Sequence, residues 1–380
     1  MNYWAEMLSR AALIVCHPTD TVSQKLLGLT VGERLLLALE KGGVGRVAFA
    51  GEGPRPVSER AGLTVVEPGE AQEDVEERYL LPADLVFDPA LISSETLPAG
   101  LPIRKVSAAE WEAAVRDPAA WLESLGTGRA ASGRDFAIRV TDRAAFRRAE
   151  QALMQSLKKA ADGIVSRYLN RRISTFISKR LARTPVRPNH ITAVVFLVGV
   201  LSGPFAFLGT PLGFALGGLC YWLSAVLDGC DGEISRLKYQ GSPLGAWLDT
   251  VVDDLACLSF ISGMYPALSR NAGHPYWLYL GGVAVLFFLL TILPRYIVMA
   301  RYGSGDFQKL AKATRPENPG ALSALVLGLR DIVFRTDFLP FAGMVTAVIG
   351  HPEIFALPFA LGTLASAVDS LLTLAKVKAR

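Results

Sequence analysis

The sequence predicts a multi-domain protein with an N-terminal α/β domain followed by an all-α domain of six transmembrane helices. Residues 1–160 carry charged side chains throughout, whereas long uncharged runs such as "YWLYLGGVAVLFFLLTILP" occur from residue 191 onward. Apolar runs of about twenty residues are long enough to cross a bilayer as helices. The chain has 380 residues, 51% of them hydrophobic, and this length accommodates two or three domains.

In residues 1–145, short β-like runs alternate with helical runs. The helical runs are "VGERLLLALEKGG" and "AAEWEAAVRDPAAWLESL". The predicted strands are "ALIVCH", "RVAFAG", "GLTVVE", "ERYLLPADLVFD", "IRKVS" and "FAIRVTD". Because strands that alternate with helices usually pair in parallel, this order predicts an α/β domain with a parallel sheet.

Residues 146–190 are predicted to form a linker that contains an amphipathic helix. The helix has an apolar stripe formed by Ile164, Tyr168, Ile173, Ile177 and Leu181. Its positive charges are Arg167, Arg171, Arg172, Lys179, Arg180 and Arg183. This pattern is typical of a helix on anionic headgroups, and a second interpretation is that some arginines bind a substrate phosphate. Pro185 and Pro188 should end the helix, and Asn189 or Thr192 should cap the next one.

The predicted membrane domain, residues 191–380, contains six candidate spans, at 191–208, 211–228, 245–267, 276–300, 332–350 and 353–375. Lys and Arg are concentrated before the first span, after the second and fourth spans, and after the sixth. Because such loops stay in the cytoplasm, both termini and the loop after the second span are predicted to be cytoplasmic. We recognise no secretory signal, and the four cysteines indicate neither a metal site nor a disulfide framework.

Four aspartates stand at helical spacing on either side of the turn between the second and third spans. Asp228 and Asp231 are three residues apart and Asp249 and Asp253 are four apart, so each pair projects from one helix face. The intervening "LKYQGSPLG" predicts a turn between antiparallel helices, which brings the pairs together. Close carboxylates repel one another, and Mg²⁺, Mn²⁺ or Ca²⁺ relieves the repulsion. Bridged metal pairs commonly stabilise the attacking and leaving oxygens at phosphorus.

Three residues of the same segment also point to phosphate chemistry. Arg236 is suited to contacting a phosphate through two hydrogen bonds. Gly232 and Gly245 lack side chains and would let a flat ligand approach the backbone. The alternative interpretation is that the aspartates are interfacial loop residues or partners of nearby Arg and Lys.

The segment resembles the CDP-alcohol phosphotransferase signature, D-x2-D-G-x2-A-R-x8-G-x3-D-x3-D. The matching residues, at every spacing, are Asp228, Asp231, Gly232, Arg236, Gly245, Asp249 and Asp253. Ser235 stands where the signature has alanine, and because both are small we expect little change in the chemistry. The stretch "RPNHIT", which contains Asn189 and Thr192, resembles the sequence that introduces the family's first membrane helix.

This resemblance implies a role for each matching residue. Asp228, Asp231, Asp249 and Asp253 would hold two Mg²⁺ or Mn²⁺ ions, and Asp253 would also take the proton of the acceptor hydroxyl. The nucleotide of the donor would lie along Gly232, Ser235, Arg236 and Gly245, near Asn189 and Thr192. The implied reaction transfers a phospho-alcohol group from a CDP-alcohol to a second alcohol and releases CMP, in a six-helix homodimer. Asp254 lies about 100° further around the helix and is not expected to bind metal.

The N-terminal domain resembles the Rossmann-like sugar nucleotidyltransferases in two segments, the stretch from Gln24 to Gly51 and "LLPADLVFDPAL", which would make Asp84 a metal ligand. The stretch "HPTDTVSQK" has no glycine where those enzymes wrap a triphosphate with backbone N–H groups. We therefore expect a degenerate, inactive nucleotidyltransferase-like domain, although Lys25 and Arg34 are possible replacements for the missing phosphate-binding groups.

The pairing of this domain with the membrane domain resembles bifunctional inositol-phosphate cytidylyltransferase and di-inositol-phosphate-phosphate synthase proteins. This resemblance favours an inositol phosphate or a similar phosphorylated polyol as a substrate.

The acceptor site and two rival functions remain open at the level of sequence. Arg295 and Arg301, with Arg183, are candidates for the acceptor phosphate, but arginines near span ends also extend to the interface for solvation. The expected partners are a CDP-alcohol, an alcohol and the lipid bilayer, with no nucleic acid. A cation transporter would also use paired aspartates, but it has no need for Arg236 among them. A catalytically inactive scaffold would not need the complete acidic set.

Overall fold

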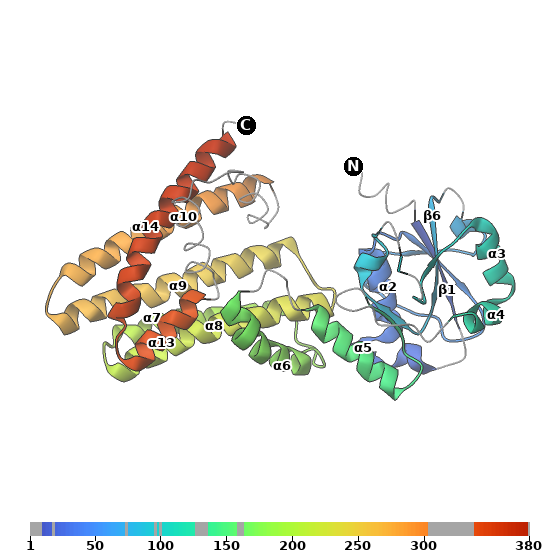
Figure 1. Cartoon of the computed structure of the whole chain (residues 1–380), viewed down its shortest axis with the longest axis horizontal. Coiled ribbons are helices and arrows are strands. Elements are labelled where there is room, and N and C mark those ends of the chain that lie inside the picture. Colours follow the sequence, from blue (N-terminus) through green and yellow to red (C-terminus); the bar gives the residue numbers. More distant parts are fainter. Residues whose placement is uncertain are drawn as a thin grey trace. The chain divides into compact units, whose positions relative to one another are not determined.

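The computed structural model of the chain describes residues 10–16, 20–72, 75–94, 97–98, 101–125, 136–157, 163–302 and 338–378. The chain divides into two compact units (Figure 1). The first unit comprises Met1–Lys158 with the short segments Ala182–Pro185 and Leu237–Tyr239. The second comprises Lys159–Leu181, Val186–Arg236 and Gln240–Arg380. The first unit contains a sheet and helices, and the second is helical, which confirms the predicted fold class.

The first unit is built on a five-stranded sheet in the order β5-β4-β1-β6-β8. The strands are β1 (Arg10–Val15), β4 (Arg46–Ala50), β5 (Thr64–Val65), β6 (Glu77–Pro82) and β8 (Arg104–Lys105). β1 pairs in parallel with β4 and β6, so that Leu13 lies opposite both Ala48 and Leu80. β5 extends the parallel sheet beside β4, whereas β8 pairs antiparallel with β6. The predicted parallel sheet is therefore present, with an antiparallel strand at one edge.

Helices cover both faces of this sheet. Ile14 of β1 belongs to the same buried cluster as Leu35 of α2 (Val31–Lys41). Leu13 points to the opposite face, because side chains alternate along a strand, and shares a buried cluster with Trp111 of α3 (Ala108–Arg116). A central strand that is buried on both faces is typical of α/β folds.

The first unit contains further strands, helices and 3₁₀ turns. They are β2 (Lys25–Leu26), β3 (Leu29–Thr30), β7 (Leu85–Phe87), β9 (Ala137–Arg139), α4 (Pro118–Glu123), α5 (Arg143–Ser156), and the 3₁₀ turns η1 (Asp20–Ser23), η2 (Glu70–Gln72) and η3 (Pro89–Leu91). The helical run predicted over 108–125 is divided at Asp117, whose carboxylate accepts a 3.0 Å hydrogen bond from Ala120 N and caps α4. The division follows from Pro118, which has no N–H to continue the preceding helix.

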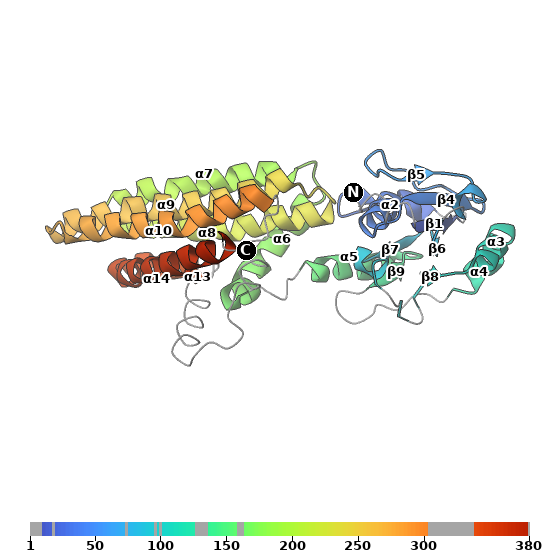
Figure 2. The ribbon, with the colours of Figure 1, turned by 90° about the horizontal axis from the view of Figure 1, so that it is seen from above.

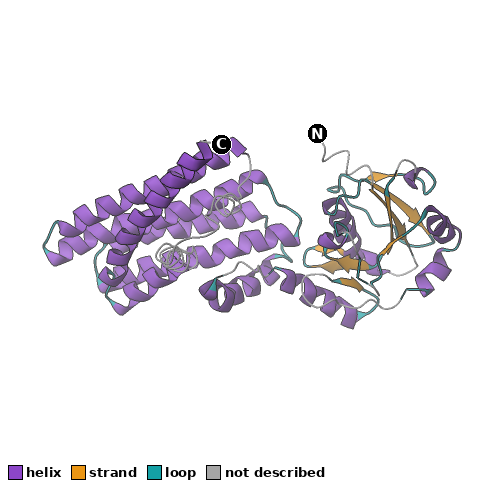
Figure 3. Ribbon diagram, turned by 45° about the horizontal axis from the view of Figure 1, so that its top comes forward, coloured by secondary structure: helices purple, strands orange, loops and turns teal. Residues whose placement is uncertain are grey.

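The described part of the second unit consists of helices, and all the strands drawn in Figure 3 belong to the first unit. The helices are α6 (Arg171–Leu181), preceded by the π-helical turn η4 (Ser166–Asn170), and then α7 (Pro188–Phe207), α8 (Pro211–Leu237), α9 (Pro243–Ala272), α10 (Tyr276–Tyr302), α13 (Phe338–Ile349) and α14 (Glu353–Lys378). α9 packs against both α7 and α10 (Figure 2).

Three of these helices are long and apolar enough to cross a membrane, by length and composition alone. They are Pro188–Phe207, Pro211–Leu237 and the segment Tyr276–Leu293 of α10. The third predicted span lies on α9, which carries the acidic residues, and the sixth lies on α14. The fifth falls partly on α13 and partly on residues outside the described ranges. The helices therefore follow the predicted order.

α7 and α9 approach each other through small residues. A Cβ on Gly263 would collide with the carbonyl oxygen of Gly203, and a Cβ on Gly199 would lie 2.6 Å from the Cβ of Ala256. The hydroxyl of Ser259 accepts from Gly203 N at 3.2 Å and donates to Val200 O at 2.7 Å. Small residues that let two backbones approach, with hydrogen bonds across the contact, are typical of helix pairs within membranes.

We predict that Gly263→Leu separates α7 from α9 and lowers the midpoint of thermal unfolding of the detergent-solubilised protein. Overpacking of a close contact costs about 1–3 kcal/mol or more. Gly282→Leu is the matched control, because a Cβ on Gly282 of α10 would meet no atom of the described residues within 4 Å. Equal midpoints for the two variants would contradict the close α7–α9 contact.

Candidate functional site

The acidic residues of the signature come from two consecutive helices, α8 and α9. Asp228 and Asp231 lie near the end of α8, and Asp249 and Asp253 lie in the first turns of α9. α9 begins after Ser242, whose hydroxyl accepts a 3.0 Å hydrogen bond from Gly245 N, and Pro243 occupies the first helical position. A serine cap followed by proline is a strong helix start, so the local sequence determines where α9 begins.

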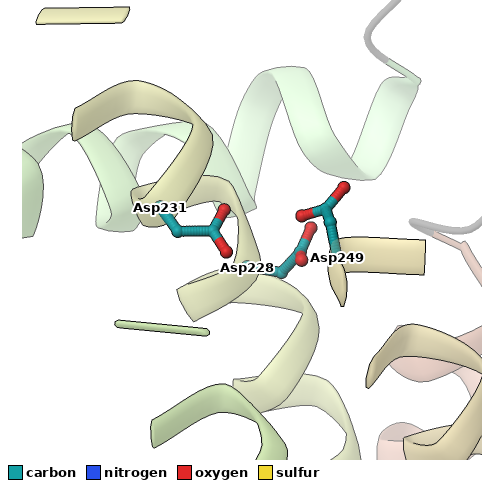
Figure 4. Close-up of side chains that lie close together, drawn as sticks. All are labelled: Asp228, Asp231 and Asp249. Carbon is teal, nitrogen blue, oxygen red and sulfur yellow. The ribbon is translucent and has the colours of Figure 1, made fainter. Parts of the chain in front are cut away.

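Three of the four aspartates converge, as Figure 4 shows. Asp228, Asp231 and Asp249 each offer a carboxylate oxygen, and these oxygens all lie within 4.8 Å of one another. Asp231 is buried, whereas Asp228 and Asp249 are half-buried. The predicted turn between antiparallel helices therefore brings Asp249 to the pair Asp228 and Asp231.

Two of the carboxylates in this cluster have hydrogen-bonding arrangements that favour a bound cation. Thr192 of α7 donates its hydroxyl hydrogen to Oδ2 of Asp231 at 2.7 Å, which orients that carboxylate. Oδ1 of Asp228 is buried and has no hydrogen-bond partner among the described residues. A buried carboxylate oxygen without a partner is costly, and a cation bound among the three side chains would satisfy it.

The donor set fits a hard divalent cation. Carboxylate oxygens are the ligands that Mg²⁺, Mn²⁺ and Ca²⁺ prefer, and three close negative charges attract such an ion strongly. Asp228, Asp231 and Asp249 are the residues that would hold it. Asp253 lies four residues beyond Asp249, half-buried, and its predicted part in metal binding remains a prediction.

The predicted nucleotide-binding residues lie on the same two helices and at the start of α7. A Cβ on Gly232 would meet only the Arg236 side chain, at 3.5 Å, and a Cβ on Gly245 would meet only the Ser242 hydroxyl, at 3.0 Å. In the described part of the chain, Gly232 therefore leaves space beside the backbone, whereas a side chain on Gly245 would press on the capping hydroxyl of Ser242. Ser235 and Arg236 are half-buried on the last turns of α8.

Asn189 and Thr192 of the stretch "RPNHIT" do not occupy the helix-cap position predicted for them. α7 begins at Pro188, and its N-cap residue is Arg187, which makes no side-chain capping bond. The prediction that Asn189 or Thr192 caps the helix is therefore wrong, because Pro188 already fills the first helical position. Asn189 is exposed in the first turn, and Thr192 contacts Asp231 instead.

Asp254 has a contact that the sequence did not indicate. Its Oδ2 accepts a 2.6 Å hydrogen bond from the hydroxyl of Tyr296 on α10, and the Tyr296 ring stacks at a tilt on Trp247, 5.3 Å between centroids. Asp254 thus connects α9 to α10, next to the predicted base Asp253.

Of the three candidate acceptor arginines, only Arg183 has a described side chain. Arg183 forms an ion pair with Glu150, 2.6 Å between Nη2 and Oε1, on the exposed surface of the first unit. The side chains of Arg295 and Arg301 on α10 lie outside the described residues. The acceptor site therefore remains a prediction.

In the first unit, Asp84 is fully buried between β6 and β7. Both of its carboxylate oxygens accept hydrogen bonds from Arg139, at 3.2 Å from Nε and 3.3 Å from Nη2. Arg34 is also buried and donates to the carbonyls of Leu26 and Leu27. A bidentate guanidinium partner occupies the oxygens that a metal would need, so this arrangement supports the degenerate interpretation of the domain.

We predict that Asp228→Asn, Asp231→Asn and Asp249→Asn each weaken Mn²⁺ binding to the purified protein at least tenfold, because each removes a charged oxygen ligand. Asp254→Asn is the control. Its amide oxygen still accepts from Tyr296, and Asp254 is not part of the cluster, so Mn²⁺ binding should be unchanged. Electron paramagnetic resonance titration measures the free ion. Wild-type affinity in any of the three variants would exclude that residue as a ligand.

Comparison with known proteins agrees with this site. Residues 186–349 match the CDP-alcohol phosphatidyltransferase family. The chain is 38% identical over 144 residues to the "Bifunctional IPC transferase and DIPP synthase" of Thermococcus kodakarensis, a match of 37% of this chain and 31% of that protein. The protein of the same name from Archaeoglobus fulgidus is 41% identical over 130 residues, 33% of this chain and 26% of that protein. The archaetidylinositol phosphate synthase of Pyrococcus horikoshii is 31% identical over 88 residues, 23% of this chain and 45% of that protein.

The matched segment thus spans less than a third of the length of the two bifunctional relatives. The family match falls on the helical part of the chain. The matched range includes α7, α8 and α9 with all four signature aspartates. The resemblance inferred from the signature is confirmed, and the chain carries a CDP-alcohol phosphatidyltransferase domain over residues 186–349.

Proposed function

We propose that the protein is an integral-membrane enzyme that transfers a phospho-alcohol group from a CDP-alcohol to the hydroxyl of a second alcohol and releases CMP. The observation that carries this proposal is the convergence of Asp228, Asp231 and Asp249 from two helices to within 4.8 Å. The signature around them supplies Gly232, Arg236 and Gly245. The names of the relatives support an inositol phosphate or a similar phosphorylated polyol as one substrate.

In this reaction, the acceptor oxygen forms a bond to the donor phosphorus while the bond from that phosphorus to CMP breaks. Asp253 takes the proton from the acceptor hydroxyl, because a carboxylate one helical turn from the cluster is within reach of the reacting centre. Arg236 binds the donor diphosphate, and Gly232 and Gly245 leave room for the nucleotide. Thr192 keeps Asp231 oriented through its 2.7 Å hydrogen bond. A divalent cation held by the aspartates would neutralise charge on the phosphate oxygens.

In the membrane the protein forms a homodimer, and both termini of each chain lie in the cytoplasm. The exposure of α10 supports a contact with lipid or a second copy, since the described residues bury only 11% of its segment Tyr276–Leu293. The distribution of Lys and Arg in the sequence supports the orientation.

The test is CMP release by the purified protein, with CDP-diacylglycerol, CDP-inositol and CDP-glycerol as donors and several alcohols as acceptors. We expect acceptor-dependent CMP release from at least one donor, requiring Mg²⁺ or Mn²⁺. Cation flux in proteoliposomes without CMP release would favour the transporter, and neither activity would favour the scaffold. Either result would overturn the proposal.

Glycine variants test whether CMP is released at the site formed by the signature residues. Gly232→Leu and Gly245→Leu should raise the KM for the donor or abolish release, because a side chain would fill the open space beside each backbone. Both should fold, because among the described residues neither new Cβ meets backbone atoms. The tight contact, 3.0 Å from the Gly245 position, is with the Ser242 side chain. Gly282→Leu should retain activity. If Gly232→Leu and Gly245→Leu both bound the donor normally, the nucleotide would have to bind elsewhere.

We further propose that the first unit does not make the CDP-alcohol. Asp84 is held by Arg139 and Arg34 is held by backbone carbonyls, so neither is open to CTP or its metal. The full chain should therefore release no pyrophosphate from CTP and a polyol phosphate, in a preparation that does release CMP from a ready-made donor. Release of pyrophosphate that is lost in Asp84→Ala would show a bifunctional protein instead.

A further inference from the structure

Glu233 is a buried carboxylate that the proposed mechanism does not use. It lies two residues after Asp231 on α8, about 200° around the helix, and so faces away from the aspartate cluster. The signature leaves its position unspecified. None of its surface is exposed. A fully buried carboxylate needs a compensating charge and hydrogen bonds, so its partners indicate why it is retained.

Those partners come from α6. Nη1 of Arg171 lies 2.9 Å from Oε1 of Glu233, in an ion pair whose guanidinium side chain is 11% exposed. The hydroxyl of Ser174 donates to the same oxygen at 2.7 Å. Oε2 of Glu233 is buried without a hydrogen-bond partner among the described residues. The carboxylate therefore depends on Arg171 for its charge balance.

The rest of the contact between α6 and α8 is also polar. α6 and the turn before it bury Asn170, Ser174 and Ser178, spaced four residues apart. Oδ1 of Asn170 accepts from Trp222 Nε1 at 3.1 Å, and the Cys230 thiol donates to Ser174 O at 3.6 Å. These contacts lie on either side of Asp228 along α8.

Three apolar side chains of the same segment are exposed. Ile164, Tyr168 and Phe176 are all more than half exposed. Two residues of the predicted apolar stripe, Ile164 and Tyr168, are thus exposed, whereas Ile173, Ile177 and Leu181 are half-buried. The face against α8 contains the hydrogen bonds described above. Directional contacts of this kind permit only one rotation of α8 against α6.

We propose that Glu233 and Arg171 are positioning residues, which fix the rotation of the α8 segment that carries Asp228 and Asp231 and so set the geometry of the divalent-cation site. The proposal rests on the proposed function in one respect, that the aspartate cluster binds a divalent cation. Groups that orient metal ligands typically change metal affinity 10–100-fold when they are replaced. Here the orientation acts through the helix backbone.

The test compares Mn²⁺ binding and thermal unfolding of the purified full chain. Glu233→Gln retains the shape and an acceptor for Ser174 but removes the charge that pairs with Arg171. We expect it to raise the half-saturating Mn²⁺ concentration about tenfold. Arg171→Gln should have a similar effect, and Arg171→Lys should restore part of the affinity. The double variant Arg171→Gln, Glu233→Gln should bind Mn²⁺ no more weakly than the weaker single variant, because the two residues act as a pair.

Glu112→Gln is the matched control, because Glu112 forms an exposed ion pair with Arg116 in the first unit. It should change neither Mn²⁺ binding nor the unfolding midpoint. A lower unfolding midpoint in Glu233→Gln with unchanged Mn²⁺ affinity would overturn the positioning role and leave a structural one. Unchanged values of both quantities would also overturn it. If the wild-type chain did not bind Mn²⁺, the metal site itself would be overturned. This outcome is separate from the others because it is measured on the wild-type chain alone.

Discussion

Repulsion among three aspartate side chains is the constraint on which the helical unit depends. Two unit charges 4 Å apart near a protein surface repel by about 4 kcal/mol, whereas a hydrogen bond contributes about 0.5–1.5 kcal/mol. The bond from Thr192 to Asp231 therefore cannot by itself hold the cluster together. The helices must be fixed by other contacts, and a cation must supply most of the compensation. The close contact of Gly203 with Gly263 fixes α7 against α9, and the Glu233–Arg171 pair fixes α6 against α8.

The first unit combines an α/β sheet with a buried ion pair at the aspartate that the sequence marks as a candidate metal ligand. Its sheet is complete, with β1 buried on both faces and helices packed on each side. Asp84, in the segment that resembles nucleotidyltransferases, is paired with Arg139 of β9. A buried ion pair of this kind removes the cost of an isolated carboxylate, and breaking it by changing one partner would be strongly destabilising. Asp84 is therefore held by contacts within the unit.

Much of the fold could be predicted because the two periodicities are clear in the sequence. The strand "RVAFA" and the helix "VGERLLLALEK" lie where they were expected, as do the starts of α8 and α9. The convergence of Asp228, Asp231 and Asp249 followed from their spacing around a Gly-Ser-Pro turn. The partners of Glu233, Asp254 and Asp84 could not be predicted, since each partner is at least forty residues away in sequence. Helical spacing shows that Glu233 faces away from the cluster, but not what it meets there.

The order of residues along the chain has a consequence for biosynthesis. Arg171 precedes Glu233 by 62 residues, so the cation of the buried pair leaves the ribosome before the anion. α6 and the residues before it expose Ile164, Tyr168 and Phe176, through which this segment can rest at the membrane surface while α7 and α8 are still being made. When the end of α8 arrives, its carboxylate meets a guanidinium that is already in place. Glu233 then need not enter an apolar environment as an isolated charge, which would oppose insertion of the helix that bears the metal ligands.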